Sequence, residues 1–453
     1  MRAGAAIAGG AALLLWPALL NRYPLVFSDT GAFLAQTVMG WPVWDKPFIY
    51  GPLLHALHWR TSLWLPALAQ GLLLSWLLWL TQRVVRGQVA AGTHLLLCAV
   101  LAGFTAAPWF AALLMPDILA PALVLTLFLL GFGRDRLARA ETWSLGLVAA
   151  LATAAHLSHL PIAAALLLPV ALLRRRWRVV LRCAAPLLAA MLLLLATNWA
   201  AHGRAALSPY GAVFALARLV ADGPAARTIA ARCPEAGWHL CHWAGRLPAD
   251  SDLFLWQGDG PVWAPRPDGA SPGGPISLAP EAATILRETL LREPLAVLRA
   301  AAANTLRQLG MMRVGDTLGP ENLQPSVARQ LALGFPAEEQ WRFAHSLQAR
   351  GRLPDAAAPF LWPHEAALLL GALAALLAGA AALRAGDRRR LGLVLCILAG
   401  LVANAAATGA LSGPHDRYQA RIVWLLPLAG LLGWRRPAAI AAVPGKAFTD
   451  PLR

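Results

Sequence analysis

A carboxylate and an ammonium group lie close together in the polar segment that follows the first apolar stretch. The sequence reads FSDTG around Asp29 and WDKPFIY around Lys46. The chain carries 39 lysines and arginines, yet its only other lysine is Lys446. An ammonium binds phosphate as a point charge, and a carboxylate can take a proton from a nucleophile. Together they suit group transfer from a phosphate-activated donor to a hydroxyl or an amine.

Both residues also have a plainer interpretation. Asp29, or Ser28 before it, is suited to be the N-cap of a helix over roughly residues 30–39. The lysine at position 46 is also consistent with chance in so arginine-rich a chain. Asp45, next to Lys46, is a competing base for the same chemistry.

Three further segments supply polar groups that can join this site. Asp117 follows Met-Pro and could act as a base or position an acceptor or a divalent ion; a helix N-cap is the alternative. His156 and His159 lie in the sequence HLSHL between two apolar runs. His415 and Arg417 lie in SGPHDRYQAR, where they could bind a donor phosphate, or where Arg and Tyr could simply anchor the chain at a membrane interface.

The composition is that of a polytopic membrane protein. Of 453 residues, 58% are hydrophobic and 14% are charged, and the mean hydropathy is +0.55. A hydrocarbon layer about 30 Å thick needs about 20 apolar residues per helix, and the Leu/Ala-rich runs favour helices over a barrel. The net charge of +16 arises from arginines grouped between apolar runs, as in cytoplasmic loops, which argues against nucleic acid as a partner.

The apolar runs predict an all-α fold with about ten transmembrane helices. We place the spans near 3–20, 62–81, 90–107, 114–132, 143–158, 160–173, 179–198, 363–383, 391–410 and 419–434. The arginine-rich loops alternate with the others, which predicts that both termini are cytoplasmic and that loop 21–61 faces outward. The pair 143–158 and 160–173 and the short last span could instead be re-entrant or tilted. The first apolar stretch could be read as a secretory signal, but we expect an uncleaved anchor.

The chain divides by composition into four regions. They are an N-terminal transmembrane module over 1–198, a mainly helical extracytoplasmic domain over 199–362, C-terminal transmembrane helices over 363–436 and a cytoplasmic tail over 437–453. In the extracytoplasmic domain a helix is expected to begin at Pro294, with Leu295 and Leu298 on its buried side. Cys233 and Cys241 are expected to form a disulfide; a metal site that includes the histidines flanking Cys241 is the alternative.

The order of these motifs resembles that of the integral-membrane glycosyltransferases of the GT-C superfamily. The resemblance is to the aminoarabinose transferase and protein O-mannosyltransferase branch, which is glycosyltransferase family 39-like. In that branch an acidic residue leads a short helix after the first span, and Lys-Pro-Pro-Leu-x-Tyr-Trp precedes the second. Here Phe48 replaces the second proline and Gly51 replaces the tryptophan. The HLSHLP segment lies where the family often has Lys-Gly-Pro, and the segment with Arg417 resembles the family's Arg-Tyr segment.

The resemblance implies a polyprenyl-phosphate-linked sugar as donor and an active site on the outer face of a bacterial inner membrane. Asp29 would be the catalytic acid or base, and Lys46 would contact the lipid phosphate together with Tyr50 of the same motif. Arg417 and His415 would also meet the phosphate. We expect Asp29, Lys46 and Arg417 to line one cavity at the membrane boundary. The sequence leaves open the sugar, the acceptor, which could be a lipid, a glycan or a protein, and any need for a divalent metal.

Two other functions remain open. A lipid or polysaccharide transporter would place ionisable groups near the middle of the membrane on interrupted helices. A non-catalytic assembly factor would use residues 199–362 to bind a partner.

Overall fold

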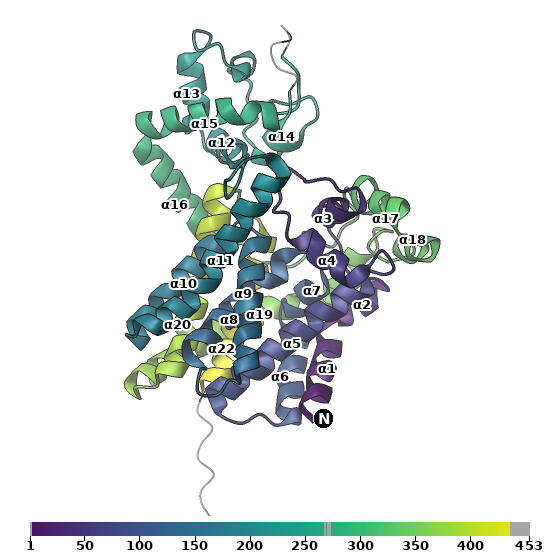
Figure 1. Cartoon of the computed structure of the whole chain (residues 1–453), viewed down its shortest axis with the longest axis vertical. Helices are drawn as coiled ribbons and strands as arrows, with labels where there is room; N and C mark the ends of the chain where they lie inside the picture. The colour runs from purple at the N-terminus through teal and green to yellow at the C-terminus, as the bar shows by residue number, and fades with distance from the viewer. Residues whose placement is uncertain (1, 267–268, 270–272, 435–453) are drawn as a thin grey trace, which may run out of the picture.

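The computed structural model describes residues 2–266, 269 and 273–434. Within these residues the chain is helical, and the backbone pairing between Leu25 and Leu113 is an isolated bridge without a sheet. Long helices pack side by side in a bundle, and shorter helices gather beyond one end of it (Figure 1). The predicted all-α class is therefore confirmed, whereas the predicted tail over 437–453 lies outside the described residues.

Four helices are long and apolar enough to cross a membrane. They are α5 (Trp64–Arg86), α11 (Trp177–His202), α19 (Leu353–Arg384) and α20 (Arg388–Leu411). The shortest has 23 residues, which at about 1.5 Å per residue exceeds a hydrocarbon thickness of about 30 Å. Their length and composition are those of a helical membrane protein.

Helix α8 (Leu119–Phe132) lies at the centre of the bundle. All of its residues are buried, so it has no polar stripe that would face water. Helix α20 approaches it closely through glycines: a Cβ on Gly392 would lie 2.6 Å from the ring of Phe132, and one on Gly400 would lie 2.7 Å from Val124. These close contacts fix α20 against the central helix.

Besides those on α8 and the four long helices, the other predicted spans fall on helices of at most 17 residues. They are α1 (Arg2–Leu14), α2 (Trp16–Asn21), α6 (Ala91–Phe104), α9 (Arg139–Ala155), α10 (His159–Arg174), α21 (Asp416–Val423) and α22 (Leu425–Gly433). The predicted span 3–20 is divided at Leu15, just before Pro17, and the predicted span 419–434 is divided at Trp424. The predicted pair 143–158 and 160–173 forms two helices, α9 and α10, that meet at residues 156–158.

The predicted boundary between residues 362 and 363 falls inside a helix. Helix α19 runs without interruption for 32 residues from Leu353 and contains Pro359 and Pro363. Pro359 and Pro363 lie inside the helix, where neither residue has a backbone N–H to donate, and the helix nevertheless continues through both.

The first part of the predicted extracytoplasmic domain forms a unit with its own core. This part, the 210–285 unit, contains α12 (Gly211–Ala221), α13 (Pro224–Arg232), a 3-10 turn η2 (His239–Trp243), α14 (Ser251–Trp256) and most of α15 (Pro275–Arg292). Its core includes Val213, Leu216, Ile229, Phe254 and Ile285. Trp44 of the first loop stacks on Phe214 at 5.1 Å between ring centroids and lies 5.8 Å from Trp256.

The second part of that predicted domain packs elsewhere. A π-helical turn η3 (Gln324–Ala328), α17 (Arg329–Gly334) and α18 (Ala337–Ala344) share a core with the first loop, made of Tyr23, Leu34, Val327, Leu331, Phe335 and Phe343. The Tyr23 hydroxyl donates to the buried Glu339 carboxylate at 2.7 Å, and the backbone N–H of Leu63 donates to it at 2.7 Å. Residues 199–362 thus form two packing units.

Helix α16 (Pro294–Gly310) connects the two units and lies along α20. Leu295 and Leu298 are 64% and 66% exposed, so the expectation that they are buried was wrong. The helix faces α20 with its other side, where a Cβ on Gly409 would lie 2.6 Å from the carbonyl oxygen of Asn304. Leu295 and Leu298 therefore lie on the exposed side of α16.

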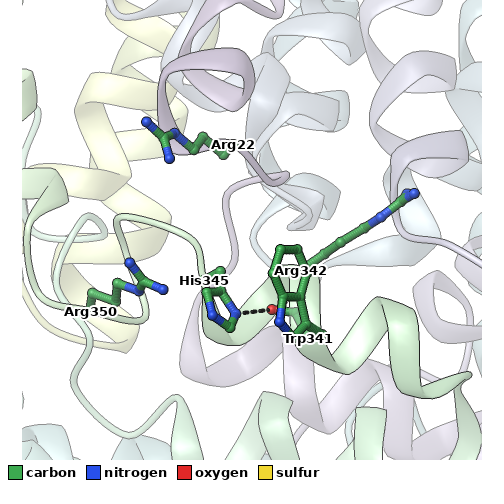
Figure 2. A pocket seen from close by; sticks show the side chains of 5 residues that line it. All are labelled: Arg22, Trp341, Arg342, His345 and Arg350. Carbon is green, nitrogen blue, oxygen red and sulfur yellow. Dashed lines mark hydrogen bonds between the residues drawn. The ribbon is translucent and has the colours of Figure 1, made fainter.

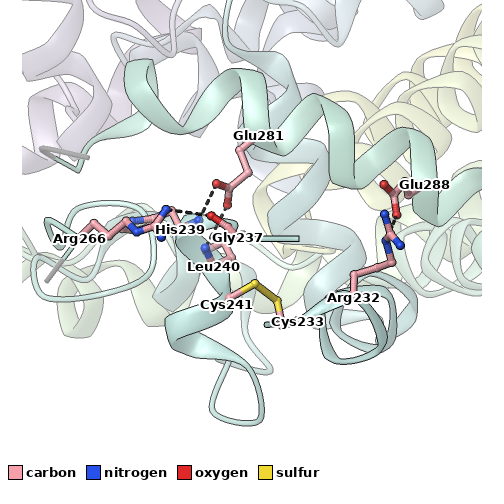
Figure 3. Close-up of a disulfide and its surroundings, with 9 residues drawn as sticks. All are labelled: Arg232, Cys233, Gly237, His239, Leu240, Cys241, Arg266, Glu281 and Glu288. Atoms are coloured by element: carbon pink, nitrogen blue, oxygen red, sulfur yellow. Dashed lines mark hydrogen bonds and ion pairs between the residues drawn. A yellow bond between two sulfur atoms is a disulfide. The ribbon is translucent and has the colours of Figure 1, made fainter. Parts of the chain in front are cut away.

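Cys233 and Cys241 are joined by a disulfide in the 210–285 unit (Figure 3). The Glu281 carboxylate of α15 accepts hydrogen bonds from the backbone N–H groups of His239 and Leu240 at 2.7 and 3.0 Å. The His239 ring bonds the carbonyl of Pro261 at 3.0 Å. The loop between the two cysteines is thus fastened to α15 by polar contacts.

Candidate active site

Asp29 lies in the first turn of α3 (Ser28–Val38). Residue 27 occupies the N-cap position in extended conformation, and the Thr30 hydroxyl accepts its backbone N–H at 2.9 Å. The same hydroxyl donates to the carbonyl of Leu114 at 3.0 Å. Neither Ser28 nor Asp29 is therefore the N-cap, and the Asp29 carboxylate is free to make tertiary contacts at a helix start that favours negative charge.

Lys46 provides that tertiary contact. Its Nζ lies 3.2 Å from Asp29 Oδ1 and also pairs with the Asp45 carboxylate. The exposed fractions of the Lys46, Asp29 and Asp45 side chains are 12%, 33% and 6%. Burial tends to raise the pKa of Asp29, but Lys46 and Arg417 outweigh burial and hold that pKa below its ordinary value. Burial tends to lower the pKa of Lys46, but the two carboxylates raise it above its ordinary value.

Gln36 of α3 holds the loop that carries Lys46. Its side-chain amide donates to the carbonyl of Pro47 at 3.1 Å and accepts the backbone N–H of Gly51 at 3.2 Å. A Cβ on Gly51 would lie 2.4 Å from the carbonyl oxygen of Phe33. Gly51 therefore permits a close approach of this loop to α3 that a tryptophan at that position would prevent.

Arg417 reaches the same region from α21. Its side chain is 11% exposed, and its guanidinium lies 4.5 Å from the ring centroid of Phe27, the residue that starts α3. Its Nε lies 4.0 Å from Asp117 Oδ1, and its charge lowers the pKa of Asp29. Its Nη1 is buried and has no hydrogen-bond partner among the described residues. An unpartnered buried donor is costly, so this atom is suited to bind a ligand.

Asp117 lies in the 3-10 turn η1 (Pro116–Ile118), and its carboxylate pairs with both Arg417 and Arg421. Arg421 Nη1 lies 3.4 Å from the same Asp117 oxygen, and the Arg421 side chain is fully buried. Arg421 also donates to Asn404 Oδ1 at 2.7 Å and to Ser158 Oγ at 2.9 Å. Sequence reasoning did not give Arg421 a role. Its spacing of four residues from Arg417, on one face of a helix, is the signal that could have found it.

The two histidines adjoin this network through Ser158. The His156 Nδ1 lies 2.8 Å from Ser158 Oγ, and the rings of His156 and His159 are 5.3 Å apart. The His159 Nδ1 bonds the carbonyl of Ala152 at 2.6 Å, and its Nε2 is buried without a partner among the described residues. His156 thus reaches Arg421 through Ser158, and His159 packs against His156.

Tyr50 and His415 lie at the margins of the site. The Tyr50 hydroxyl donates to Gln70 Oε1 at 2.6 Å, and its ring packs edge-on against Phe33. His415 Nε2 lies 3.5 Å from Asp252 Oδ2 of α14, and both side chains are largely exposed. Tyr50 is therefore committed to the core, and His415 faces the 210–285 unit.

Asp29, Lys46 and Arg417 come together through the contacts described above. An arginine-lined pocket and an apolar groove, which are described below, lie elsewhere, and neither is lined by these three residues. A cavity shared by the three side chains stays a prediction. No group of three or more His, Cys, Asp or Glu side chains in the described residues is arranged to hold a metal ion.

Comparison with protein-family models, with curated proteins and with solved structures gave no match for this chain. The described residues thus form an all-helical protein in which four helices are apolar enough to span a membrane.

Proposed function

We propose that this chain is a membrane glycosyltransferase that moves a sugar from a polyprenyl-phosphate carrier to an acceptor hydroxyl or amine. The observation that carries the proposal is the convergence of Asp29, Lys46 and Arg417 from three separate segments. One carboxylate and two cations in a partly desolvated site are the groups that this transfer requires. The GT-C-like resemblance of the motifs supports the same reaction.

In the proposed reaction the bond between the anomeric carbon and the phosphate oxygen breaks, and its electron pair leaves with the polyprenyl phosphate. The acceptor oxygen or nitrogen forms the new bond to the anomeric carbon, and its proton passes to the Asp29 carboxylate. Lys46 and Arg417 stabilise the negative charge on the departing phosphate. Asp45, which also pairs with Lys46, is the competing base.

The charges of the site suggest how donor binding would activate the base. Three carboxylates, on Asp29, Asp45 and Asp117, face the cations of Lys46, Arg417 and Arg421. An incoming phosphate competes with Asp29 for Lys46. When the Lys46 ammonium group turns from Asp29 to the phosphate, the pKa of the Asp29 carboxyl rises toward its ordinary value. The carboxylate then becomes a stronger base.

We place the protein in a bacterial inner membrane with about ten spans, cytoplasmic termini and the site on the periplasmic side. Contacts join several of the arginine-rich loops at one end of the bundle: Arg136 donates to the carbonyl of Val84, and Arg389 pairs with Asp135. The disulfide between Cys233 and Cys241 is in keeping with an oxidising compartment for the 210–285 unit. Trp44 attaches that unit to the loop of Lys46, so both would face the same compartment.

The test is sugar transfer by the full chain in proteoliposomes. Radiolabelled polyprenyl-phosphate mannose and polyprenyl-phosphate aminoarabinose serve as donors, and a membrane-lipid and glycan extract serves as acceptor. We expect Asp29→Asn and Lys46→Ala each to lower the rate by about 100-fold, which is typical for loss of one base or one electrostatic stabiliser.

Asp259→Asn is the matched control for Asp29→Asn, because Asp259 is exposed and distant in sequence from the site. Undiminished transfer by Asp29→Asn would remove the assigned base. Donor binding that is unaffected by Lys46→Ala would remove the phosphate contact.

A lipid transporter is the second candidate, because Asp117 and Arg421 form an ion pair buried within the helices. Buried ionisable pairs of this kind are typical of substrate pathways. A transporter would move the lipid-linked sugar between the leaflets of the proteoliposome and leave the sugar–phosphate bond intact. Chromatography of the recovered lipid separates the two outcomes.

A further inference from the structure

We propose that a second site, remote in sequence from Asp29 and Lys46, binds a phosphate group. This site, the arginine pocket, has a volume of about 160 Å³ and is lined by Arg22, Trp341, Arg342, His345 and Arg350. Figure 2 shows the His345 ring between Arg350 and Trp341. The lining holds three guanidinium groups and no carboxylate. Guanidinium groups bind phosphate oxygens through paired, charge-assisted hydrogen bonds.

Two of the three arginines are available to a ligand. Arg342 donates to the Glu338 carboxylate at 2.6 Å, which offsets its charge. The Arg22 and Arg350 side chains are exposed, and neither makes an ion pair with the described residues. Unbalanced positive charge in a concave site attracts an anion.

The backbone of the pocket is fixed by buried hydrogen bonds. The backbone N–H of Leu347 donates to the carbonyl of Asn21 at 3.1 Å, and that of Gln348 donates to Asn21 Oδ1 at 2.8 Å. Asn21 is fully buried, so the end of α2 and the segment before Arg350 form one rigid unit. Arg22 has φ +63°, in the left-handed region that arginine rarely adopts. The strained conformation is maintained by these contacts, which hold Arg22 at the pocket.

The surroundings of the pocket favour a lipid as the carrier of the phosphate. Helix α2 ends at Asn21, just before Arg22, and begins at Trp16, about 9 Å from Arg22 along its axis at about 1.5 Å per residue. Trp16 borders a second cavity, the apolar groove, with a volume of about 470 Å³. The groove is lined by Gly9, Ala12, Leu13, Trp16, Ala99, Ala102 and Gly103. These lining residues are apolar and mostly small, so the groove suits an acyl chain whose headgroup lies in the arginine pocket.

The experiment measures binding to the purified full chain in neutral detergent. Phosphatidylglycerol is the phosphate-bearing lipid, diacylglycerol is the matched lipid without phosphate, and retention is measured by native mass spectrometry. Inorganic phosphate is tested separately by its effect on the thermal midpoint. We expect phosphatidylglycerol to bind at least about tenfold more tightly than diacylglycerol, and Arg22→Gln/Arg350→Gln to remove that preference.

Arg204→Gln/Arg246→Gln is the matched control, because these exposed arginines lie over the rings of Tyr210 and Trp243 and have no carboxylate partner among the described residues. If only inorganic phosphate binds in a manner that depends on Arg22 and Arg350, the site takes free phosphate. If neither probe depends on them, or if the control pair has the same effect, the proposal is overturned. Sugar transfer is not measured, so this outcome is independent of the proposed function.

Discussion

Lys46 is shared between two carboxylates, and this sharing determines the resting state of the candidate site. A single ammonium that pairs with Asp29 and Asp45 satisfies both at once, and its removal would leave two negative charges together. Without Lys46, Arg417 would still offset part of the negative charge of Asp29, since the charge of Arg417 also lowers the pKa of that carboxyl. Among the described residues, Lys46 is the ion-pair partner of Asp45. The lysine is therefore needed for the arrangement of the loop as well as for its proposed chemistry.

Asp117→Asn is expected to destabilise the protein strongly. The substitution leaves the fully buried guanidinium of Arg421 without its carboxylate, and breaking a buried ion pair typically costs about 3–5 kcal/mol. The thermal midpoint of the purified protein in detergent measures the effect. Asp135→Asn is the control, because its carboxylate is 59% exposed and pairs with Arg389 at the surface, where a pair contributes at most about 1 kcal/mol. If both variants lowered the thermal midpoint equally, the buried pair of Asp117 and Arg421 would not be the stabilising contact proposed here.

Single residues with unusual chemistry could be predicted from the sequence, and residues that position them could not. Asp29, Lys46, Asp117 and Arg417 are charges next to apolar runs, and the structure brings them together. Gln36 has no such signal, because a glutamine within a helix is ordinary until its amide is seen to bond the facing loop. The role predicted for Tyr50 differs from its observed contact with Gln70, since local sequence does not show which way a ring at a helix start will turn.

At the scale of elements, α3 is positioned by close backbone contacts on two sides. A Cβ on Gly51 would meet its Phe33 carbonyl, and a Cβ on Gly31 would lie 2.6 Å from the carbonyl carbon of Ser326 in η3. The helix is thus held between the Lys46 loop and the second part of the 199–362 segment. Its orientation, and hence that of Asp29, depends on both contacts.

Gly31→Ala is expected to lower stability by about 1–3 kcal/mol, because the new methyl group meets backbone that cannot rotate away. The shift of α3 should also lower sugar transfer. Gly92→Ala in α6 is the control: a Cβ there has open space, so the change should be neutral or stabilising. Thermal midpoints and transfer rates of the two variants give the comparison, and identical behaviour would show that α3 tolerates displacement.

The existence of helices followed from apolar runs, but several of their ends did not. The break at Leu15 and the division at Trp424 depend on how each segment packs in the bundle, and hydropathy alone merges such pieces. Conversely, the boundary predicted between residues 362 and 363 lies inside α19, which continues through Pro359 and Pro363. A proline inside a helix removes one backbone hydrogen bond, and it is tolerated when neighbouring groups compensate.

At the scale of the whole molecule, the disulfide is expected to stabilise the 210–285 unit selectively. Cys233 and Cys241 are separated by 8 residues, and closing so short a loop contributes about 2–3 kcal/mol in the chain-entropy account. Cys233→Ser/Cys241→Ser should therefore increase amide hydrogen exchange in α12 to α15 and leave α20 unchanged. Wild-type protein treated with a reductant should match the variant. Equal increases in α20 would indicate that the unit has no stability of its own.

The division of residues 199–362 into two packing units was not predictable from composition. Polar character and Pro/Gly content mark the whole segment as lying outside the apolar bundle, and they are similar in both parts. The two parts differ in what completes their hydrophobic cores. The core of the 210–285 unit is formed mainly by its own residues, whereas the core of the second part also includes residues of the first loop, such as Tyr23 and Leu34. Contacts between segments about 300 residues apart leave no local trace in a single sequence.

Trp44 gives the first loop a mechanical role. It lies two residues before Lys46, and its ring is inserted beside Phe214 and Trp256 of the 210–285 unit. Because these rings are in contact, we expect a tilt of the 210–285 unit to displace the backbone that carries the Lys46 ammonium group. Only two peptide bonds separate Trp44 from Lys46, so the position of that charge should follow the position of the unit.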